Sequence, residues 1–390
     1  MPASAESALA QSFSDAFGSR PSGVWSAPGR VNLMGEHTDY NAGLCLPIAL
    51  PHRTYAAARL RQDRRLRLLS LQSSQGYELD LDDVRAGNPS GWGAYAAGVL
   101  WALREACHEV RGLDLLVDGR VPLGAGLSSS AALECAVAAA ASDLLHLDLL
   151  SDDRARGTLA AICVNAENTI AQAPTGGMDQ SASLLAREDH ALLLDCRDFS
   201  ITQVPLDLSA HGLSLLVMDT RTEHALVDGQ YAQRRHSCEQ AARQLGLSSL
   251  REVAFDQLDE TLERLSDSET RKRVKHIVTE IERVRQTAAM LRAGRVPDVG
   301  PVLNASHASM RDDFEISCAE LDVAVEAATT HGALGARMTG GGFGGSAVAL
   351  VPTGRVAEVS AAVIQAFANK GFAAPSCFAV TAGGPARRES

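Results

Sequence analysis

The segment Ala27–Asn41 contains the densest group of side chains able to bind a polar ligand. Arg30, Glu36, His37 and Asp39 fall within ten residues, two glycines bracket the first of them, and a proline precedes it. Charged groups spaced this closely are a poor basis for a hydrophobic core, because each buried charge needs a partner. The segment therefore predicts a binding site for a small, hydroxyl-rich molecule.

A second candidate site is the loop Gly124–Ser130, which joins a predicted strand, Leu113–Val117, to a predicted helix of small residues that begins at Ala131. Its glycines let the backbone approach a ligand, and the free N–H groups and the dipole at the helix start favour an anion. Three consecutive serines add hydroxyls for phosphate oxygens or a magnesium ion. The alternative is an ordinary strand-to-helix turn capped by serine.

Two common nucleotide-binding patterns do not fit this loop. A Walker A site needs Gly-Lys followed by Ser or Thr, and that sequence is missing here. In a dinucleotide fingerprint, the third glycine position would hold Ser129. The acidic residue about 20 positions further on, Asp143, lies inside the predicted helix and not after a second strand.

A second glycine-rich segment, Gly340–Gly345, has five glycines in six residues and leads into a predicted strand, Ala347–Val351. So much backbone freedom is costly unless the chain must bend tightly or approach another group closely. A plain surface loop is the alternative. Two glycine-rich loops in one chain nevertheless favour a phosphate site more than either loop does alone.

Three further residues are ambiguous when they are considered one at a time. Asp179 follows a glycine pair that would let a ligand approach, but it could equally cap a helix. Glu167 lies in a predicted helix, Thr158–Gln172, where a solvated carboxylate is the ordinary interpretation. Tyr231 stands in no recognisable pattern.

The composition limits the classes of partner and the cellular compartment. The chain has 390 residues, a net charge of −11 and 4% aromatic residues, which argues against nucleic acid and anionic membranes as partners. Its eight cysteines are scattered without zinc-site spacing, and most have apolar neighbours, so we expect buried free thiols. The first residues lack the pattern of a signal peptide. These features predict a cytoplasmic protein.

The hydrophobic pattern predicts a mixture of helices and strands without strict βαβ alternation, which indicates an α+β fold. The polar stretch 200–210 is a candidate domain boundary. Apolar residues three or four apart in 271–292 predict a helix that faces the core, with a dimer seam as the alternative. We expect helices at 9–17, 92–110, 131–147, 158–172 and 271–292, and strands at 44–50, 54–60, 66–71, 77–81, 113–117, 191–195, 213–219, 347–351 and 378–381.

Three motifs, in this order, resemble the GHMP family of small-molecule kinases. The stretch 29–41, Gly-Arg-Val-Asn-Leu-Met-Gly-Glu-His-Thr-Asp-Tyr-Asn, is similar to the signature of the galactokinase branch, 122–131 to the ATP loop, and 338–346 to the C-terminal glycine-rich motif. The resemblance covers nearly the whole chain. The residues at 34, 42 and 177 depart from the usual family pattern, and none of the three removes a functional side chain.

The resemblance implies roles for individual residues. It assigns the sugar hydroxyls to Glu36, His37, Thr38, Asp39, Gly176 and Tyr231. It assigns the ATP phosphates to Gly124, Ala125, Gly126, Leu127, Ser128, Ser129 and Ser130. It further makes Asp179 and Arg30 catalytic, gives Mg²⁺ to Ser130 and Glu167, and lets the loop Gly340–Gly345 close the site. Glu167 thereby changes from an ordinary helix residue to a metal ligand.

The implied activity is ATP-dependent phosphorylation of α-D-galactose at its C1 hydroxyl to galactose 1-phosphate and ADP, the first committed step of galactose breakdown. The implied fold has two domains, residues 1–207 like domain 2 of ribosomal protein S5 (ribosomal-protein-S5-domain-2-like) and residues 208–390 ferredoxin-like, with the active site between them. The implied partners are galactose and MgATP, with no nucleic acid and no membrane. We expect a monomer or a weak dimer.

Two alternatives remain open at this stage. A kinase for a related sugar, such as N-acetylgalactosamine or arabinose, would share these motifs, because pocket volume is not visible in a sequence. A catalytically silent sugar sensor that acts on a transcription partner is the alternative from another class. The retention of the serines at 128–130, together with Asp179 and Arg30, disfavours a sensor.

Overall fold

The computed structural model describes residues 5–173, 175–222 and 227–390. Residues 1–4, 174 and 223–226, which include Pro174 and His224, lie outside the described residues. Within those ranges, every helix is too short or too polar to cross a membrane. The helices are α1 (Ala5–Phe17), α2 (Trp92–Glu105), α3 (Ser129–Leu144), α4 (Asp153–Ala166), α5 (Met178–Leu185), α6 (Val227–Leu245), α7 (Leu258–Glu263), α8 (Ser268–Arg292), α9 (Val299–Asp312), α10 (Ala319–Thr330) and α11 (Val356–Lys370).

The strands form three sheets and are mostly antiparallel, which confirms the predicted α+β class. The strands are β1 (Gly23–Asn32), β2 (Leu44–Cys45), β3 (Pro47–Leu60), β4 (Arg65–Ser70), β5 (Ser73–Asp80), β6 (Leu113–Gly119), β7 (His190–Asp195), β8 (Ser200–Pro205), β9 (Leu213–Asp219), β10 (Gly335–Thr339), β11 (Ser346–Pro352), β12 (Ser376–Val380) and β13 (Arg387–Arg388).

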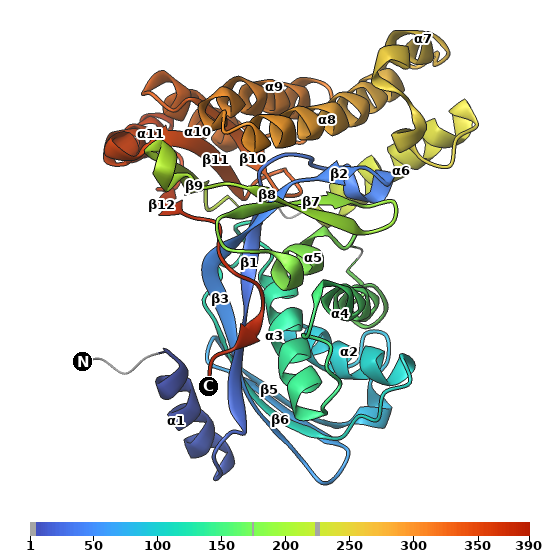
Figure 1. Cartoon of the computed structure of the whole chain (residues 1–390), viewed down its shortest axis with the longest axis vertical. Helices are drawn as coiled ribbons and strands as arrows, with labels where there is room; N and C mark the ends of the chain where they lie inside the picture. Colours follow the sequence, from blue (N-terminus) through green and yellow to red (C-terminus); the bar gives the residue numbers. More distant parts are fainter. Residues whose placement is uncertain (1–4, 174, 223–226) are drawn as a thin grey trace.

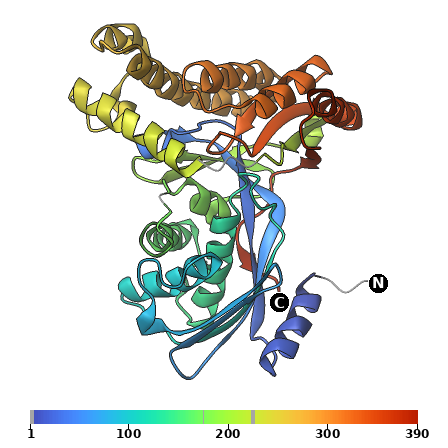
Figure 2. The same cartoon turned by 180° about the vertical axis from the view of Figure 1, so that it is seen from behind.

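The largest sheet has the order β13-β1-β3-β6-β4-β5 and lies between two layers of helix. Figure 1 shows α2 to α5 on one face and α1 on the other, and Figure 2 shows the same layers from behind. The α1 helix is held by Leu9 and Phe13, which are buried against Val24 and Leu116 of the sheet. The 3.6-residue spacing of its apolar side chains predicted the helix, and the structure shows which face of the sheet it covers.

Helix α3 directs its N-terminus at the loop 124–130 because small residues let it lie close to the sheet. Its buried residues are mainly alanines, and it packs on β1 and β3. Alanine is also the best helix former, so local propensity and packing agree. The helix therefore delivers the free N–H groups of its first turn to the phosphate-loop candidate.

One long strand replaces two predicted ones. The expected strands 44–50 and 54–60 are largely one strand, β3, so the prediction of a break at Pro51 was wrong. The register between β1 and β3 slips opposite Pro51, from the pair Pro28–Arg53 to the pair Arg30–Ala49. A proline is tolerated at such a bulge because no ladder hydrogen bond is required there.

Other differences concern the ends and types of elements. The helix expected at 158–172 begins at Asp153, and its last residues, Glu167–Ala171, form a π-helical turn. The strands β1, β8 and β10 were not predicted, because each overlaps a motif or a polar stretch. Residues 200–205, within the predicted boundary, pair with β7 instead of forming a linker.

The second half of the chain forms the sheet β10-β11-β9-β12, which is covered by α9 to α11, while α8 packs on α9 and against β2 and β8. The small sheet β2-β7-β8 lies between this layer and the large sheet (Figure 1). The stripe along α8 is buried in the core, which confirms the core-facing prediction, and its members are Val274, Ile277, Ile281, Val284, Ala288 and Leu291.

A domain division at residue 207 stays a prediction. The last part of the chain returns to the sheet built by the first part, since β13 pairs with β1 in the large sheet. The core under α8 likewise includes Val31, Leu46 and Ile48 from the first part of the chain. The two halves therefore share a hydrophobic core around the segment that follows β1.

Candidate active site

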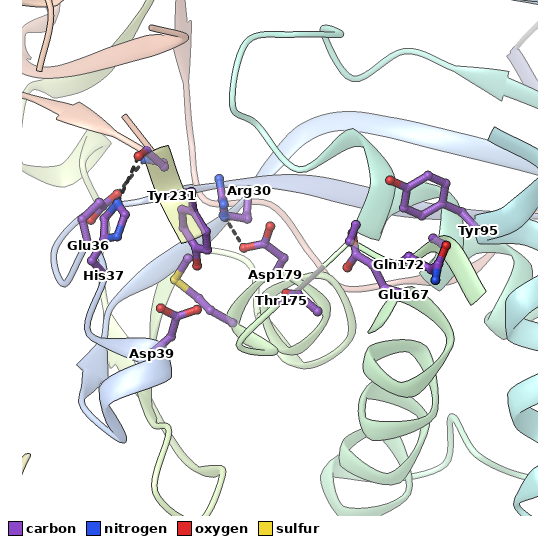
Figure 3. A pocket seen from close by; sticks show the side chains of 15 residues that line it. Arg30, Glu36, His37, Asp39, Tyr95, Glu167, Gln172, Thr175, Asp179 and Tyr231 are labelled. Atoms are coloured by element: carbon purple, nitrogen blue, oxygen red, sulfur yellow. Dashed lines mark hydrogen bonds and ion pairs between the residues drawn. The ribbon is translucent and has the colours of Figure 1, made fainter. Parts of the chain in front are cut away.

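One cavity of about 510 Å³ collects both predicted catalytic residues and most of the predicted sugar-binding residues. Seven segments contribute: the end of β1, the loop after it, α2, the stretch between α4 and α5, α5, α6, and the loop after β10. Figure 3 shows the labelled side chains around it. The lining residues are Arg30, Glu36, His37, Asp39, Tyr95, Glu167, Ala171, Gln172, Ala173, Thr175, Met178, Asp179, Tyr231, Gly340 and Gly341.

The centre of the cavity is an ion pair between Arg30 and Asp179. The Nε atom of Arg30 donates to Oδ1 of Asp179 at 2.8 Å, and Ser128 Oγ donates to the other carboxylate oxygen, Oδ2, at 2.5 Å. Burial alone would lower the pKa of Arg30, but Asp179 raises it, so the guanidinium stays charged. The pair is 8% and 22% exposed at its side chains, so it is screened only weakly by solvent.

The loop Gly124–Ser130 borders this centre without lining the cavity itself. Arg30 donates from its backbone N to the carbonyl of Leu127 at 3.0 Å, and from a terminal guanidinium nitrogen to the carbonyl of Gly126 at 2.7 Å. Ser128 has a φ of 59°, a left-handed conformation, and α3 starts at the next residue. The turn therefore presents the start of a helix beside a fixed cation, as an anion site requires.

The loop Gly340–Gly345 packs directly against the loop Gly124–Ser130. A side chain at Gly340 would place its Cβ 3.1 Å from the carbonyl oxygen of Gly126, and one at Gly345 would come 3.2 Å from that of Ala125. Ser346 Oγ also donates to the Ala125 carbonyl at 2.7 Å. The second glycine loop thus supports the first, and this close contact favours glycine at 340 and 345.

Glu36 is held by four protein donors. Its Oε1 atom accepts from Thr339 Oγ1 at 3.1 Å and from Gly340 N at 2.8 Å, while Oε2 accepts from Asn32 Nδ2 at 2.7 Å and from Arg337 at 2.5 Å. A carboxylate has about four acceptor positions, so its capacity is largely used. Glu36 ties the loop after β1 to β10 and to the second glycine loop.

A buried charge network extends behind Glu36. Arg337 is fully buried and lies 3.7 Å from Glu280, which in turn accepts from Arg283 Nε at 2.7 Å and from the backbone N of Gly35 at 3.0 Å. Burial alone would raise the pKa of Glu280, but Arg283 and Arg337 lower it, so it stays charged. The sequence contained no signal for Arg337 or Glu280, because lone charges on a strand and a helix look like surface residues.

Replacing Arg337 by methionine is expected to destabilise the protein by about 3–5 kcal/mol, because two buried carboxylates lose their common cation. Urea unfolding of Arg337→Met measures this loss. Arg355→Met is the control, since the Arg355 ion pair is exposed and its loss is expected to change stability by less than about 0.5 kcal/mol. Equal stability of the two variants would contradict a structural role for the buried network.

His37 uses both ring nitrogens within the protein. Nε2 lies 3.0 Å from the carbonyl oxygen of Gly341, so it carries the proton, and Nδ1 accepts from the hydroxyl of Tyr40 at 2.7 Å. Burial lowers the pKa of His37 to about 4, so the ring is neutral at physiological pH. Its ring lies 5.0 Å from that of Tyr231, which α6 brings to the cavity wall.

Asp39 and Gly176 come together although they are far apart in the sequence. A side chain at Gly176 would collide with the Asp39 carboxylate, so glycine is needed there. Burial, followed by the charge of Asp179, raises the pKa of Asp39 to about 6. Thr38 has a different environment from the one expected, because it is fully buried and its hydroxyl bonds to the carbonyls of Gly35 and Leu44 instead of lining the cavity.

A second acidic group lies at the other side of the Arg30–Asp179 pair (Figure 3). Burial, followed by the charge of Asp179, raises the pKa of Glu167 to about 7, while hydrogen bonds from Gln180 and Ser130 act against this rise. Glu134, also buried, lies close enough to Glu167 for their charges to interact, and burial raises its pKa well above the ordinary value. This part of the site therefore brings acidic groups together in a buried place that disfavours the charged form of each.

Several lining residues were not predicted. Tyr95, Gln172, Thr175 and Met178 face the cavity, with Tyr95 coming from the first turn of α2 and Gln172 from the end of the π-helical turn. An aromatic residue in an apolar helix is usually interpreted as a core residue, so the sequence did not identify Tyr95 as a residue of the site. Thr175 and Met178 flank the glycine pair before Asp179. That pair is the sequence feature that could have identified them as lining residues.

Three family models match parts of the chain. The galactokinase galactose-binding signature matches residues 11–60, the N-terminal domain of GHMP kinases matches 94–187, and the C-terminal part of GHMP kinases matches 287–369. The solved structure of Lactococcus lactis galactokinase complexed with galactose superimposes with a TM-score of 0.92 at 32% identity, over 98% of this chain and 99% of that one.

More distant structures share the fold alone. The Methanococcus jannaschii mevalonate kinase superimposes with a TM-score of 0.64 at 16% identity, over 92% of this chain and 98% of that chain. Together with the family models, these matches confirm the two-part GHMP kinase fold that the motifs implied.

Similar sequences cover nearly the full length. The galactokinase of Streptomyces coelicolor is 50% identical over 383 residues, which is 97% of each chain. The galactokinase of Mycobacterium tuberculosis is 43% identical over 354 residues, 90% of this chain and 95% of its own. With this identity and coverage, and with the galactose-binding signature in place, the protein belongs to the galactokinase family of GHMP kinases.

Proposed function

We propose that this protein transfers the γ-phosphoryl group of ATP to the C1 hydroxyl of α-D-galactose and releases galactose 1-phosphate and ADP. The observation that carries the proposal is the order of groups along one cavity. His37, Asp39 and Tyr231 lie at one end, the Arg30–Asp179 pair lies in the middle, and Glu167 lies beyond it (Figure 3). A sugar and a nucleotide phosphate can therefore meet at Asp179.

The sugar end is suited to hydroxyl recognition. Asp39 and the backbone beside Gly176 offer acceptors, and Tyr231 and the neutral ring of His37 form an aromatic wall. Glu36 also lines the cavity and fixes the loop after β1 through its own hydrogen bonds. A site that satisfies specific hydroxyls rejects an epimer better than an apolar pocket rejects an extra methylene, so Asp39 is the proposed selector of galactose over glucose.

The group beyond the central pair fits a magnesium ion. Two buried carboxylates, Glu134 and Glu167, lie near Asp179 with Arg30 as the nearby cation, and one oxygen of Glu134 has no partner. Among the described residues, no three of His, Cys, Asp and Glu cluster closely enough to hold a metal by themselves, and Mg²⁺ at nucleotide sites is usually bound by one or two carboxylates together with phosphate oxygens and waters. Ser130 and Glu167 are the proposed protein ligands, and the ion would neutralise phosphate charge.

The central pair supplies the chemistry at the sugar. The oxygen of the C1 hydroxyl attacks the γ-phosphorus, the bond from that phosphorus to the bridging oxygen of ADP breaks, and the hydroxyl proton passes to the carboxylate of Asp179. Each Asp179 oxygen accepts one protein hydrogen bond and keeps a further acceptor position. Because the transition state of phosphoryl transfer is loose, Arg30 contributes by charge stabilisation and by orienting Asp179.

A panel of free sugars with MgATP tests the function directly. We expect galactose to be phosphorylated with the highest kcat/KM, well above glucose, arabinose and N-acetylgalactosamine. A higher kcat/KM for N-acetylgalactosamine or arabinose would instead identify the protein as a kinase for that related sugar. Galactose binding without any phosphorylation would instead favour a sugar sensor.

The kcat/KM for galactose is expected to fall below about pH 6 in saturating MgATP, because Asp39 must be charged to accept hydroxyls and burial raises its pKa to about 6. The charged form is present above this pKa and is lost as the pH falls through it. Steady-state kinetics between pH 5 and 8 measure the profile. Asp39→Asn should be slower but lack this acidic limb, and an unchanged limb in that variant would assign the titration to another group.

A further inference from the structure

A buried glutamine joins two glutamates beside the proposed metal ligand. Gln180 Nε2 donates one hydrogen bond to Glu167 Oε2 at 2.5 Å and one to Glu134 Oε2 at 3.0 Å. Gln180 and Glu134 are fully buried, and Glu167 is 6% exposed. The proposed catalytic residue Asp179 precedes Gln180 directly, so the first turn of α5 faces both the cavity and this acidic group.

The two carboxylates fix the orientation of the Gln180 amide. An amide nitrogen has two protons, and both find a carboxylate oxygen here. A flipped amide would point its oxygen at two acceptors and would lose both hydrogen bonds. Glu134 therefore locks the amide, and the locked amide fixes the position of the Oε2 atom of Glu167.

The positions of these residues on their helices support a common purpose. Ser130 and Glu134 are four residues apart on α3, so they lie on one face of that helix. Ser130 hydrogen-bonds to Glu167, as Gln180 does, so the Glu167 carboxylate is held from two directions. Glu167 itself begins the π-helical turn that follows α4, and such turns are frequent at functional sites.

We propose that Gln180, locked by Glu134, is a positioning residue that orients Glu167 toward the divalent metal ion of MgATP. The inference rests on the proposed function, because it takes Glu167 as a metal ligand. Groups that orient metal ligands typically contribute a factor of about 10–100 to metal affinity. Neither Gln180 nor Glu134 lines the cavity, so both act through Glu167.

The test is Gln180→Met, which keeps an unbranched side chain of similar size and removes both N–H donors. The affinity of Mn²⁺ for the full-length enzyme bound to a non-hydrolysable ATP analogue is measured from the electron paramagnetic resonance signal of free Mn²⁺. We expect affinity to fall by a factor of about 10–100, with KM for galactose within about twofold of wild type. The Mg²⁺ concentration for half-maximal activity should rise in parallel.

A matched control replaces a glutamine outside the site. Gln203 on β8 also donates its amide to a neighbouring group, the carbonyl of Leu185, and also has a buried oxygen without a partner. Gln203→Met is therefore expected to keep wild-type Mn²⁺ affinity and activity. Similar losses of Mn²⁺ affinity in Gln180→Met and Gln203→Met would overturn the proposal, since the loss would then be a general consequence of removing a glutamine amide from the interior.

A second pair of variants tests the lock on the amide and covers the case in which Gln180→Met does not fold. Glu134→Gln keeps an acceptor oxygen for Gln180 and should retain Mn²⁺ affinity, whereas Glu134→Leu removes the acceptor and should weaken it. Equal Mn²⁺ affinity in these two variants and wild type would overturn the role of Glu134. Circular dichroism and thermal unfolding establish that the variants being compared are folded.

Glu167→Gln separates a failure of this inference from a failure of the proposed function. If Glu167→Gln weakens Mn²⁺ binding and folded Gln180→Met does not, the positioning role is overturned and the metal assignment stands. If Glu167→Gln leaves Mn²⁺ affinity unchanged, the metal assignment fails and the inference fails with it. The sugar panel with wild-type protein decides the kinase activity independently of either result.

Discussion

Asp179→Asn is expected to lower kcat by a factor of about 10²–10⁴, the usual contribution of a general base, while affinity for ATP stays within a few-fold of wild type. The amide has the shape of the carboxylate, so its oxygen can still accept from Arg30. Its nitrogen can donate to Ser128 in place of the hydrogen bond that Ser128 now donates. The variant should therefore fold normally and lack mainly a proton acceptor.

Single-turnover phosphorylation and a nucleotide-binding titration measure these two quantities. Asp198→Asn is the matched control, because Asp198 is a fully exposed carboxylate away from the cavity and its replacement should leave kcat unchanged. If Asp179→Asn kept kcat near the wild-type value, a role of Asp179 as base would be untenable.

The same variant should change the titration of its neighbours. The negative charge of Asp179 is, after burial, the main cause that raises the pKa of Asp39 to about 6 and that of Glu167 to about 7. Removing that charge should lower both values. The acid limit of galactose binding, measured by calorimetry at several pH values, should therefore move to lower pH in Asp179→Asn.

Arg30→Ala is the second large effect, with an expected loss of about 10²–10³ in kcat, the range seen when one preorganised donor to a developing charge is removed. The loss has two sources in this structure. The transferring phosphoryl group loses its nearest fixed cation, and Asp179 loses the 2.8 Å partner that orients its carboxylate. ATP binding should persist, because the glycine loop and the start of α3 remain.

Arg30→Lys helps to separate the two sources. Lysine keeps the charge but not the planar fork that contacts Asp179 and Gly126 together, so an intermediate kcat is expected. Arg187→Ala is the control, since Arg187 forms an exposed ion pair with Asp153 outside the cavity. A kcat for Arg30→Ala within threefold of wild type would remove Arg30 from the chemistry.

The predictable part of the fold follows from local patterns. Helix periodicity placed α1 and the buried stripe of α8, and strand patterns placed β4, β6, β7 and β9 with small errors at their ends. The break expected at Pro51 was wrong because a bulge in the β1–β3 ladder accommodates the proline, and a bulge depends on the partner strand. Patterns read along one segment contain no information about register with another.

For the site, the residue types and motifs were enough to identify the chemical groups and the family. Arg30, Asp39, Asp179, Glu167 and the glycine loops stand in recognisable segments because ligand contact demands particular residue types and close backbone approach. The sequence also favoured a partner without large negative charge, since the net charge of −11 repels polyanions.

The folded structure was needed to show which of these groups can still bind a ligand and which are used to hold other residues in place. Glu36 and His37 have most of their hydrogen-bonding capacity taken by Arg337, Gly340, Gly341 and Tyr40, whereas Asp39 lies beside Gly176 in the cavity. Gln180, Glu134 and Arg337 have no distinctive sequence context. Their importance arises because burial makes every unpaired charge or amide costly, and only the folded chain determines which groups become partners.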